Sequence, residues 1–399
     1  MFTLFIASLG GFLFGYQLAV IAGALLFFSA EFGLTSLQQG MVVSILLLGA
    51  LLGSLCAGKM ADFLGRKKTL IVTALIFCMG SLFSMVAPSF ITLLIARTLT
   101  GFAVGLVSIG APLYLAEIAP PSLRGRFVSM NQLALTIGIL VAYLVNSYFG
   151  EAGEWREMFG VAFIPAFIQL VGLFFIKEPE RVHELSQERR FSSLFHKEYR
   201  FLVLIGILLS LFQQLSGINT VIYYAPMIFE MAGTHTKEGA VIATISIGVV
   251  NVIATLCATL LLDRLGRRFF LLLGSAGMTL ALSILALSLV FPSMISPQIP
   301  LLAYIVLFAV SLGPIPWVLI SEIYPVKIRG HAMGLSLAVN WAANFFLAFI
   351  FLDLVAHVTL SGTFLIYALV AIVAFWFTYR YIPETRGKTF EEIQQLFNS

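Results

Sequence analysis

The chain has 399 residues, of which 60% are hydrophobic and only 11% are charged, against roughly 25% charged residues in an ordinary soluble domain. A folded chain of this length with this few charged side chains would not stay dispersed in water. Most of the chain must therefore face lipid. The formal net charge of +4 is small and its residues are scattered, which argues against a nucleic-acid partner.

Apolar windows of about 20 residues, the length of a membrane-spanning helix, recur along the whole chain. The first window lacks the basic start and the short core of a signal peptide, so we expect it to remain as a span. The glycine pairs Gly49/Gly53 and Gly101/Gly105 predict close-packing helix surfaces rather than sites. We therefore expect an all-α membrane protein with twelve transmembrane helices. The windows cover residues 2–28, 37–57, 69–87, 90–116, 127–149, 156–176, 201–229, 239–262, 269–291, 299–320, 332–352 and 359–381.

The positions of the basic residues predict which side of the membrane each loop faces. Twenty of the 23 Lys and Arg residues lie in the loops after even-numbered windows or in the C-terminal segment. The opposite loops contain only Arg156 and Lys237, and Arg97 lies inside the fourth window. Because cytoplasmic loops carry the excess of positive charge, we expect both termini in the cytoplasm of a cell-membrane protein.

An internal repeat divides the chain near its midpoint. We expect two six-helix halves, 1–176 and 201–382, joined by a cytoplasmic linker at 177–200 and followed by a cytoplasmic tail at 383–399. A duplicated six-helix unit with its substrate between the halves is the plan of secondary transporters. The repeated segments are 62–67 with 263–268, 117–125 with 322–330, and 179–180 with 383–384.

The polar residues inside the windows are amides rather than acids. Away from the helix ends, the windows contain no Asp, Glu, Lys or His. Amides hydrogen-bond hydroxyl groups without the desolvation cost of an ion, and tryptophan planes can stack on a sugar ring. The pattern favours a neutral polyhydroxyl ligand, with packing between helices as the alternative role. The residues are Gln17, Gln132, Gln213, Gln214, Asn219, Asn251, Asn340 and Asn344, with Trp317 and Trp341.

Two windows contain residues that interrupt a helix. The tenth contains Gly-Pro-Ile-Pro at 313–316, and the seventh contains Gly217 and then Pro226. Because proline removes a backbone donor, such breaks at membrane depth are typical of segments that line a cavity. Gln213 and Asn219 would lie on different faces of an unbroken helix. Both can reach one ligand only if the helix unwinds near Gly217, so we expect unwinding there.

Several motifs are specific in combination, namely GGFLFGYQ, QQLSGINTVIYYAP, GPIPWVLISEIYPVKIRG and PETRGKT. They resemble those of the sugar porters of the major facilitator superfamily, which include animal glucose facilitators and bacterial xylose–proton symporters. The resemblance covers the whole chain and implies alternating-access transport of a monosaccharide. It implies sugar contacts by Gln132, Gln213, Gln214, Asn219, Asn251, Trp317 and Asn340, with Phe14, Tyr223, Tyr224, Trp341 and Asn344 beside them.

The charged residues of the repeated loops resemble the inner gate of that family. The resemblance implies ion pairs between helix ends on the cytoplasmic face, and neutralisation of surface charge is the alternative. The implied pairs are Asp62 with Arg66, Glu117 with Arg124, Asp263 with Arg267, and Glu322 with Arg329.

One position bears on the transport mechanism. In proton-coupled relatives the residue after Gly-Tyr in the first span is commonly an Asp that pairs with the arginine of the fourth span. Here these positions are Gln17 and Arg97, and an amide cannot carry a proton. We therefore expect uniport of glucose or a similar hexose. The alternatives are proton-coupled symport through another group, an exporter of the same superfamily, or a sugar receptor that does not transport.

The sequence contains no sign of an enzyme. No Ser/His, paired-carboxylate or metal-ligand arrangement occurs inside the windows, and the three cysteines lie in apolar stretches without metal-ligand spacing. We expect no metal and no cofactor. The expected partners are a sugar and the lipid bilayer, and the protein is expected to act as a monomer.

Overall fold

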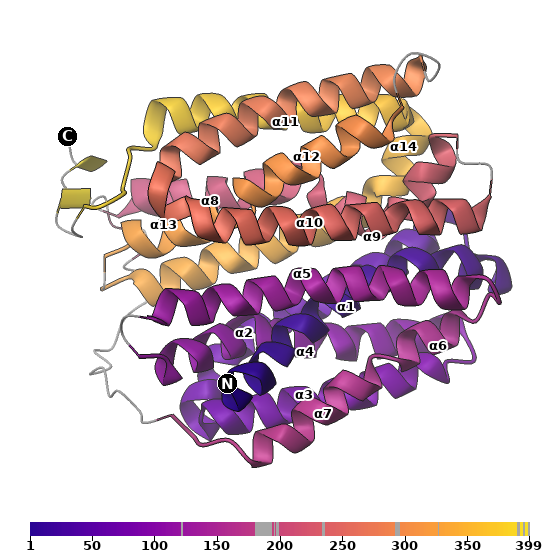
Figure 1. Ribbon diagram of the computed structural model, residues 1–399, viewed down its shortest axis with the longest axis horizontal. Coiled ribbons are helices and arrows are strands. Elements are labelled where there is room, and N and C mark those ends of the chain that lie inside the picture. Colours follow the sequence, from indigo (N-terminus) through magenta and orange to yellow (C-terminus); the bar gives the residue numbers. More distant parts are fainter. Residues whose placement is uncertain are drawn as a thin grey trace. The chain divides into compact units, whose positions relative to one another are not determined.

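The computed structural model describes residues 1–120, 123–179, 194, 196, 199–233, 236–291, 296–325, 327–388, 392–393 and 396–397, without the side chains of 124–125, 237–238 and 261–265. Within these ranges the regular structure is helical and contains no strand (Figure 1), which confirms the predicted all-α fold. The helices are α1 (Phe2–Glu31), α2 (Ser36–Leu64), α3 (Arg66–Met85), α4 (Phe90–Ile118), α5 (Arg124–Gly150), α6 (Trp155–Gly160), α7 (Phe163–Phe174), α8 (Arg200–Leu215), α9 (Ile218–Met231), α10 (Lys237–Leu265), α11 (Arg267–Val290), α12 (Gln298–Val310), α13 (Ile315–Ile323) and α14 (Arg329–Tyr381).

Eleven helical segments of the described chain are long and apolar enough to cross a membrane. The last of them, α14, has 53 residues and contains a break at Thr359, where φ is 67° and ψ is 162°. This helix therefore covers the eleventh and twelfth predicted windows. The predicted break near Gly217 is confirmed, because α8 ends and α9 begins on either side of it and its φ is 87°. The tenth window is likewise divided into α12 and α13.

The described chain forms two compact units. The first unit comprises Met1–Arg181, Asn219–Val252 and Asn344–Asp353, and the second comprises the remaining residues. The first unit therefore contains two segments from late in the sequence beside the first helices. The division into halves at 177–200 stays a prediction, because most of that linker lies outside the described residues.

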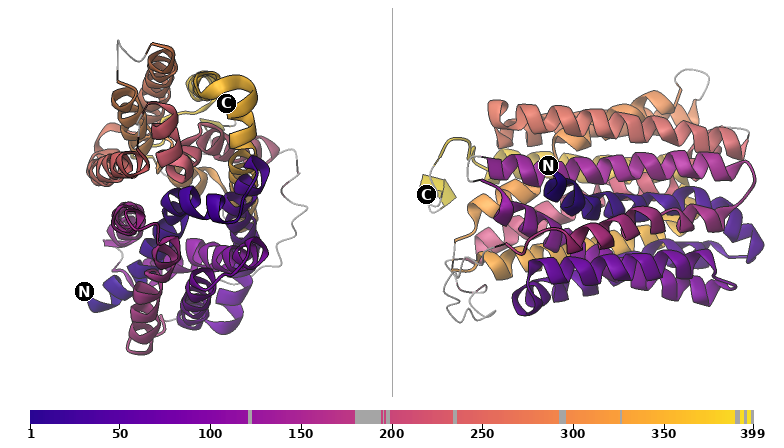
Figure 2. Two further views of the ribbon diagram at one scale, coloured as in Figure 1. Left: turned by 90° about the vertical axis from the view of Figure 1, so that its right-hand side faces the viewer. Right: turned by 60° about the horizontal axis from the view of Figure 1, so that its bottom comes forward.

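Glycines allow close approach of helices inside the first unit, where α1 packs on α5 and α2 packs on α4; both views of Figure 2 show these long helices in indigo and purple. A Cβ at Gly101 would collide with the carbonyl oxygen of Leu46, and one at Gly53 would collide with that of Phe102. Small residues at such contacts let two backbones pack directly. The predicted packing surfaces are confirmed at these two positions.

A polar cluster joins the end of α1 to the start of α6. The carboxylate of Glu31 accepts hydrogen bonds from Trp155 Nε1 at 2.6 Å and from Arg156 at 2.8 and 3.1 Å. The Arg156 guanidinium lies 4.2 Å from the centroid of the Trp155 ring. Arg156, one of the few cations outside the basic loops, therefore takes part in a packing contact within the first unit.

Candidate functional site

The buried cation Arg97 contacts Gln17, as the sequence predicts. Arg97 is 1% exposed, and its Nη1 donates to the Gln17 backbone carbonyl at 3.1 Å and to the side-chain Oε1 at 3.4 Å. Gln17 Nε2 in turn donates to Ser81 Oγ at 3.2 Å. Phe159 completes the site, with its ring centroid 5.5 Å from the guanidinium carbon. Residues from four helices of the first unit, α1, α3, α4 and α6, thus form this site around one positive charge.

No carboxylate in the described part of the chain forms an ion pair with Arg97, and its Nε has no hydrogen-bond partner there. In the described part of the chain, an amide, a carbonyl and an aromatic face contact the guanidinium. Each of these supplies a dipole or quadrupole that does not change with pH. The contribution of Ser81 was not predicted, because a serine in a span carries no signal of its partner.

A network of amides occupies the second unit. Gln213 Nε2 donates to the carbonyls of Leu312 and Gly313 at 2.8 and 2.9 Å. Asn340 Nδ2 donates to Gln213 Oε1 at 2.7 Å, and Asn340 Oδ1 accepts from Gln214 Nε2 at 3.0 Å. All three amide side chains are 5% exposed. Three of the predicted sugar-contacting residues are therefore brought together and hold one another in place.

The break between α12 and α13 explains why Gln213 binds there. Leu312 lies four residues before Pro316, which has no N–H to donate to the Leu312 carbonyl. A buried carbonyl without a donor is costly, and the Gln213 side chain supplies the missing hydrogen bond from α8. The sequence signal was present, because a proline identifies the carbonyl that it leaves free, but it does not identify the donor.

For some of the remaining predicted residues the structure shows hydrogen bonds, and for the others it shows the degree of burial. In the first unit, Asn344 Nδ2 donates to the Tyr223 hydroxyl at 3.1 Å. Tyr224 donates to the Ala348 carbonyl at 2.8 Å, and its ring stacks on Phe351 with centroids 4.7 Å apart. The other predicted residues are placed as follows: Phe14, Asn219 and Asn251 are half-buried in the first unit, Gln132 is exposed in the first unit, and in the second unit Trp317 is half-buried and Trp341 is buried.

The charged loop residues of the first unit form an ion-pair network that differs in part from the predicted one. Arg66 binds Asp62 at 2.8 Å, as predicted, and its Nε also binds Glu117 at 3.0 Å. Glu117 was expected to pair with Arg124, whose side chain lies outside the described residues. Glu117 is thus held by the arginine of the preceding repeated segment, because the start of α3 lies beside the end of α4.

The second unit repeats this arrangement. Arg267 binds Glu322 at 3.2 Å, and Thr385 Oγ1 donates to the same carboxylate at 2.6 Å. Glu322 was expected to pair with Arg329, whose Nε donates to the carbonyl of Tyr324 at 3.0 Å. The side chain of Asp263, the predicted partner of Arg267, lies outside the described residues.

Two further carboxylates bind the starts of α3 and α11, and they correct the alignment of the repeat. Glu178 accepts from the backbone N–H groups of Arg66 and Lys67 at 2.6 and 3.1 Å. Glu384 accepts from the corresponding groups of α11 at 3.0 and 3.1 Å. Such carboxylates satisfy free N–H groups and complement the helix dipole. The sequence repeat pairs Glu384 with Glu180, which lies outside the described residues, whereas Glu178 occupies the equivalent place.

The chain matches known transporters over its whole length. The family model described as "Sugar (and other) transporter" matches residues 3–182 and 180–397. The galactose-proton symporter of Escherichia coli K12 is 39% identical, with 99% of this chain and 93% of that protein aligned. The facilitated glucose transporter member 10 of solute carrier family 2 from Mus musculus is 34% identical, with 99% and 93% aligned.

A solved structure gives the same result for the fold. The inward-open xylose transporter of Escherichia coli superimposes with a TM-score of 0.84 at 30% identity, covering 99% of each chain. These relatives are transporters and not enzymes, and the described helices are long and apolar enough to span a membrane. The chain is therefore a multi-pass membrane sugar transporter, and it belongs to the sugar porter family of the major facilitator superfamily.

Proposed function

We propose that this protein is a uniporter that moves a neutral hexose such as glucose across the cell membrane by alternating access. The observation that carries the proposal is the Gln17–Arg97 contact. Proton-coupled transport needs a group whose protonation changes during the cycle. Among the described residues, the groups that contact Arg97 are the Gln17 amide, the Gln17 carbonyl and the Phe159 ring, so no carboxylate or histidine there supplies such an acid.

Amide chemistry supports a neutral sugar as the substrate. Gln213, Gln214 and Asn340 together present donors and acceptors without a net charge. Their hydrogen bonds to one another fix the orientation of each amide before a ligand arrives. An organic cation or anion would instead require a charged partner. The relative named as a facilitated glucose transporter supports the choice of a hexose.

Proton symport is the second candidate, because a galactose-proton symporter is 39% identical to this chain. One experiment separates the two mechanisms. The purified protein is reconstituted into proteoliposomes, and external pH is recorded while a sugar gradient drives uptake. Uniport predicts sugar flux without alkalinisation of the external medium. Alkalinisation in step with sugar uptake would establish symport and refute the proposal.

A pair of variants tests the role assigned to Gln17. Gln17→Asp places a titratable group beside Arg97, and it should make transport depend on pH. The control variant Gln17→Asn introduces a side chain of the same size and shape as aspartate but keeps an amide. Its transport should therefore show the pH dependence of the native protein. If Gln17→Asp transports independently of pH, the position has no coupling role. Competition of labelled glucose uptake by a panel of pentoses and hexoses identifies the substrate.

We also propose that the loop charges form the cytoplasmic gate, with both termini on that side. The bonds of Arg66 with Glu117 and of Arg267 with Glu322 tie neighbouring helix ends within each unit, so those ends would move together as one body when the inner face opens or closes. The substrate would bias this gate without contacting it. We expect the protein to act as a monomer, because the proposed sugar path lies within one chain.

A further inference from the structure

One backbone carbonyl in α9 receives its hydrogen bond from a distant helix. Pro226 lies four residues after Ile222 and has no N–H, so the Ile222 carbonyl lacks a donor within the helix. Tyr224 between them has non-helical dihedral angles, with φ at −115° and ψ at 16°. The hydroxyl of Tyr143, in α5, donates to the Ile222 carbonyl at 2.9 Å. Tyr143 is fully buried, so this hydroxyl takes the place of the missing N–H in a site closed to bulk water.

This bond crosses a tightly packed contact inside the first unit. We call that contact the seam: it joins α1, α2 and α5 to the segments Asn219–Val252 and Asn344–Asp353, which come from late in the sequence. A Cβ at Gly40 would collide with the carbonyl of Phe349, and a Cβ at Gly248 would lie 3.0 Å from Leu140 Cα. The backbones therefore pack closely at two places in the seam, and the one at Gly248 also lies beside the Tyr143 ring.

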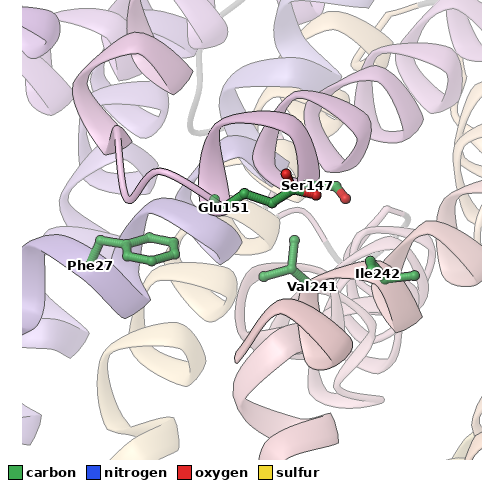
Figure 3. Close-up of a pocket in the computed structure, with 6 residues that line it drawn as sticks. Phe27, Ser147, Glu151, Val241 and Ile242 are labelled. Atoms are coloured by element: carbon green, nitrogen blue, oxygen red, sulfur yellow. The ribbon is translucent and has the colours of Figure 1, made fainter. Parts of the chain in front are cut away.

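The cavity within the seam is too small for a sugar. Figure 3 shows Phe27 of α1 and Ser147 of α5 facing Val241 and Ile242 of α10 around a pocket. The cavity measures about 10 Å³, which is room for about one water molecule. With the close contacts at Gly40 and Gly248, this small cavity shows that the seam is closed at these positions.

We propose that Tyr143 is a latch that holds α9 against α5 while the seam is closed and releases it when the seam opens. The role of this latch in transport rests on the proposed alternating-access function. When the seam opens, water can reach the Ile222 carbonyl and the Tyr143 hydroxyl. Each group then forms a hydrogen bond with water in place of the bond between them. The net contribution of such a bond is small, which lets it bias the closed state without locking it.

Spin-label distances test the latch without any sugar. Leu37 and Met231 are exposed, at 48% and 46%, and lie on opposite sides of the seam. Cysteines at both positions, in a background without the three native cysteines, carry the labels for pulsed electron resonance. Tyr143→Phe should lower the ratio of short to long distances by about two- to twelvefold, the effect of one such hydrogen bond.

A matched control is Tyr304→Phe. The Tyr304 hydroxyl donates to the Ser216 carbonyl at the same 2.9 Å and is also buried, but both residues lie in the second unit. This variant should leave the distance distribution unchanged. An equal shift in both variants would assign the effect to general loosening and overturn the proposal, as would an unchanged distribution in Tyr143→Phe.

A second variant separates the hydrogen bond from the packing of the ring. Pro226→Ala returns an N–H to the position four residues after Ile222, so that carbonyl no longer depends on Tyr143. Adding Tyr143→Phe to Pro226→Ala should therefore shift the distances less than it does in the native background. An equal shift in both backgrounds would refute the latch. Because this measurement needs no sugar, a failure of uniport in the transport assay would leave its result intact.

Discussion

Truncation of Gln213 should weaken both sugar binding and the fold, whereas truncation of Gln132 should weaken binding alone. Gln213 donates to two carbonyls and accepts from Asn340. Each such bond contributes about 0.5–1.5 kcal/mol net, so Gln213→Ala should cost about 1.5–4.5 kcal/mol of stability. The upper part of this range is the better expectation, because the freed Leu312 carbonyl faces Pro316 and has no helical donor to replace the amide.

Gln132 provides the matched comparison. Its side chain is exposed, and the structure gives it no hydrogen bond to any described residue. Gln132→Ala therefore removes a proposed sugar contact without breaking an internal bond. Loss of one hydrogen bond to the sugar should raise the dissociation constant by about two- to twelvefold in each variant.

Two measurements on purified protein test these expectations. Thermal unfolding in detergent without sugar should show a lower melting temperature for Gln213→Ala and a native value for Gln132→Ala. Calorimetric titration with glucose should show weaker binding for both variants. Equal melting temperatures would contradict the structural role of Gln213, and native affinity in either variant would remove that residue from the sugar site.

Further predictions concern helix packing and helix ends. Gly53→Ala should lower the melting temperature, because the added Cβ would collide with a backbone carbonyl. The control Gly58→Ala has no atom within 4 Å of the added Cβ, so it should be neutral or stabilising by up to about 1 kcal/mol. Equal effects of the two substitutions would contradict the packing role of Gly53. Glu384→Gln should lower the free energy of unfolding by about 0.3–1 kcal/mol, because the start of α11 loses its negative charge, and a denaturant titration that shows no loss would refute this role. Arg156→Lys should weaken the cluster around Glu31 because lysine cannot bind in the same forked manner, and the difference in melting temperature should shrink in high salt.

The sequence by itself determined the features that depend on neighbours along the chain. Composition required a lipid solvent, and the apolar windows located the spans because a helix crosses the bilayer with a fixed rise per residue. Gly217 and the prolines at 314 and 316 marked the broken helices because these residues act on their own backbone. The motifs indicated the family, and the pairing of Gln17 with Arg97 followed from the family pattern.

The tertiary structure alone decided which groups meet. Proline positions show that the carbonyls of Leu312 and Ile222 need donors, but only the packing of distant helices assigns them to Gln213 and Tyr143. The same holds for Glu178, which occupies the place that the repeat gave to Glu180. Spacing along the chain governs local conformation, whereas a hydrogen bond between helices depends on how the helices pack, and that is set by contacts between residues many positions apart.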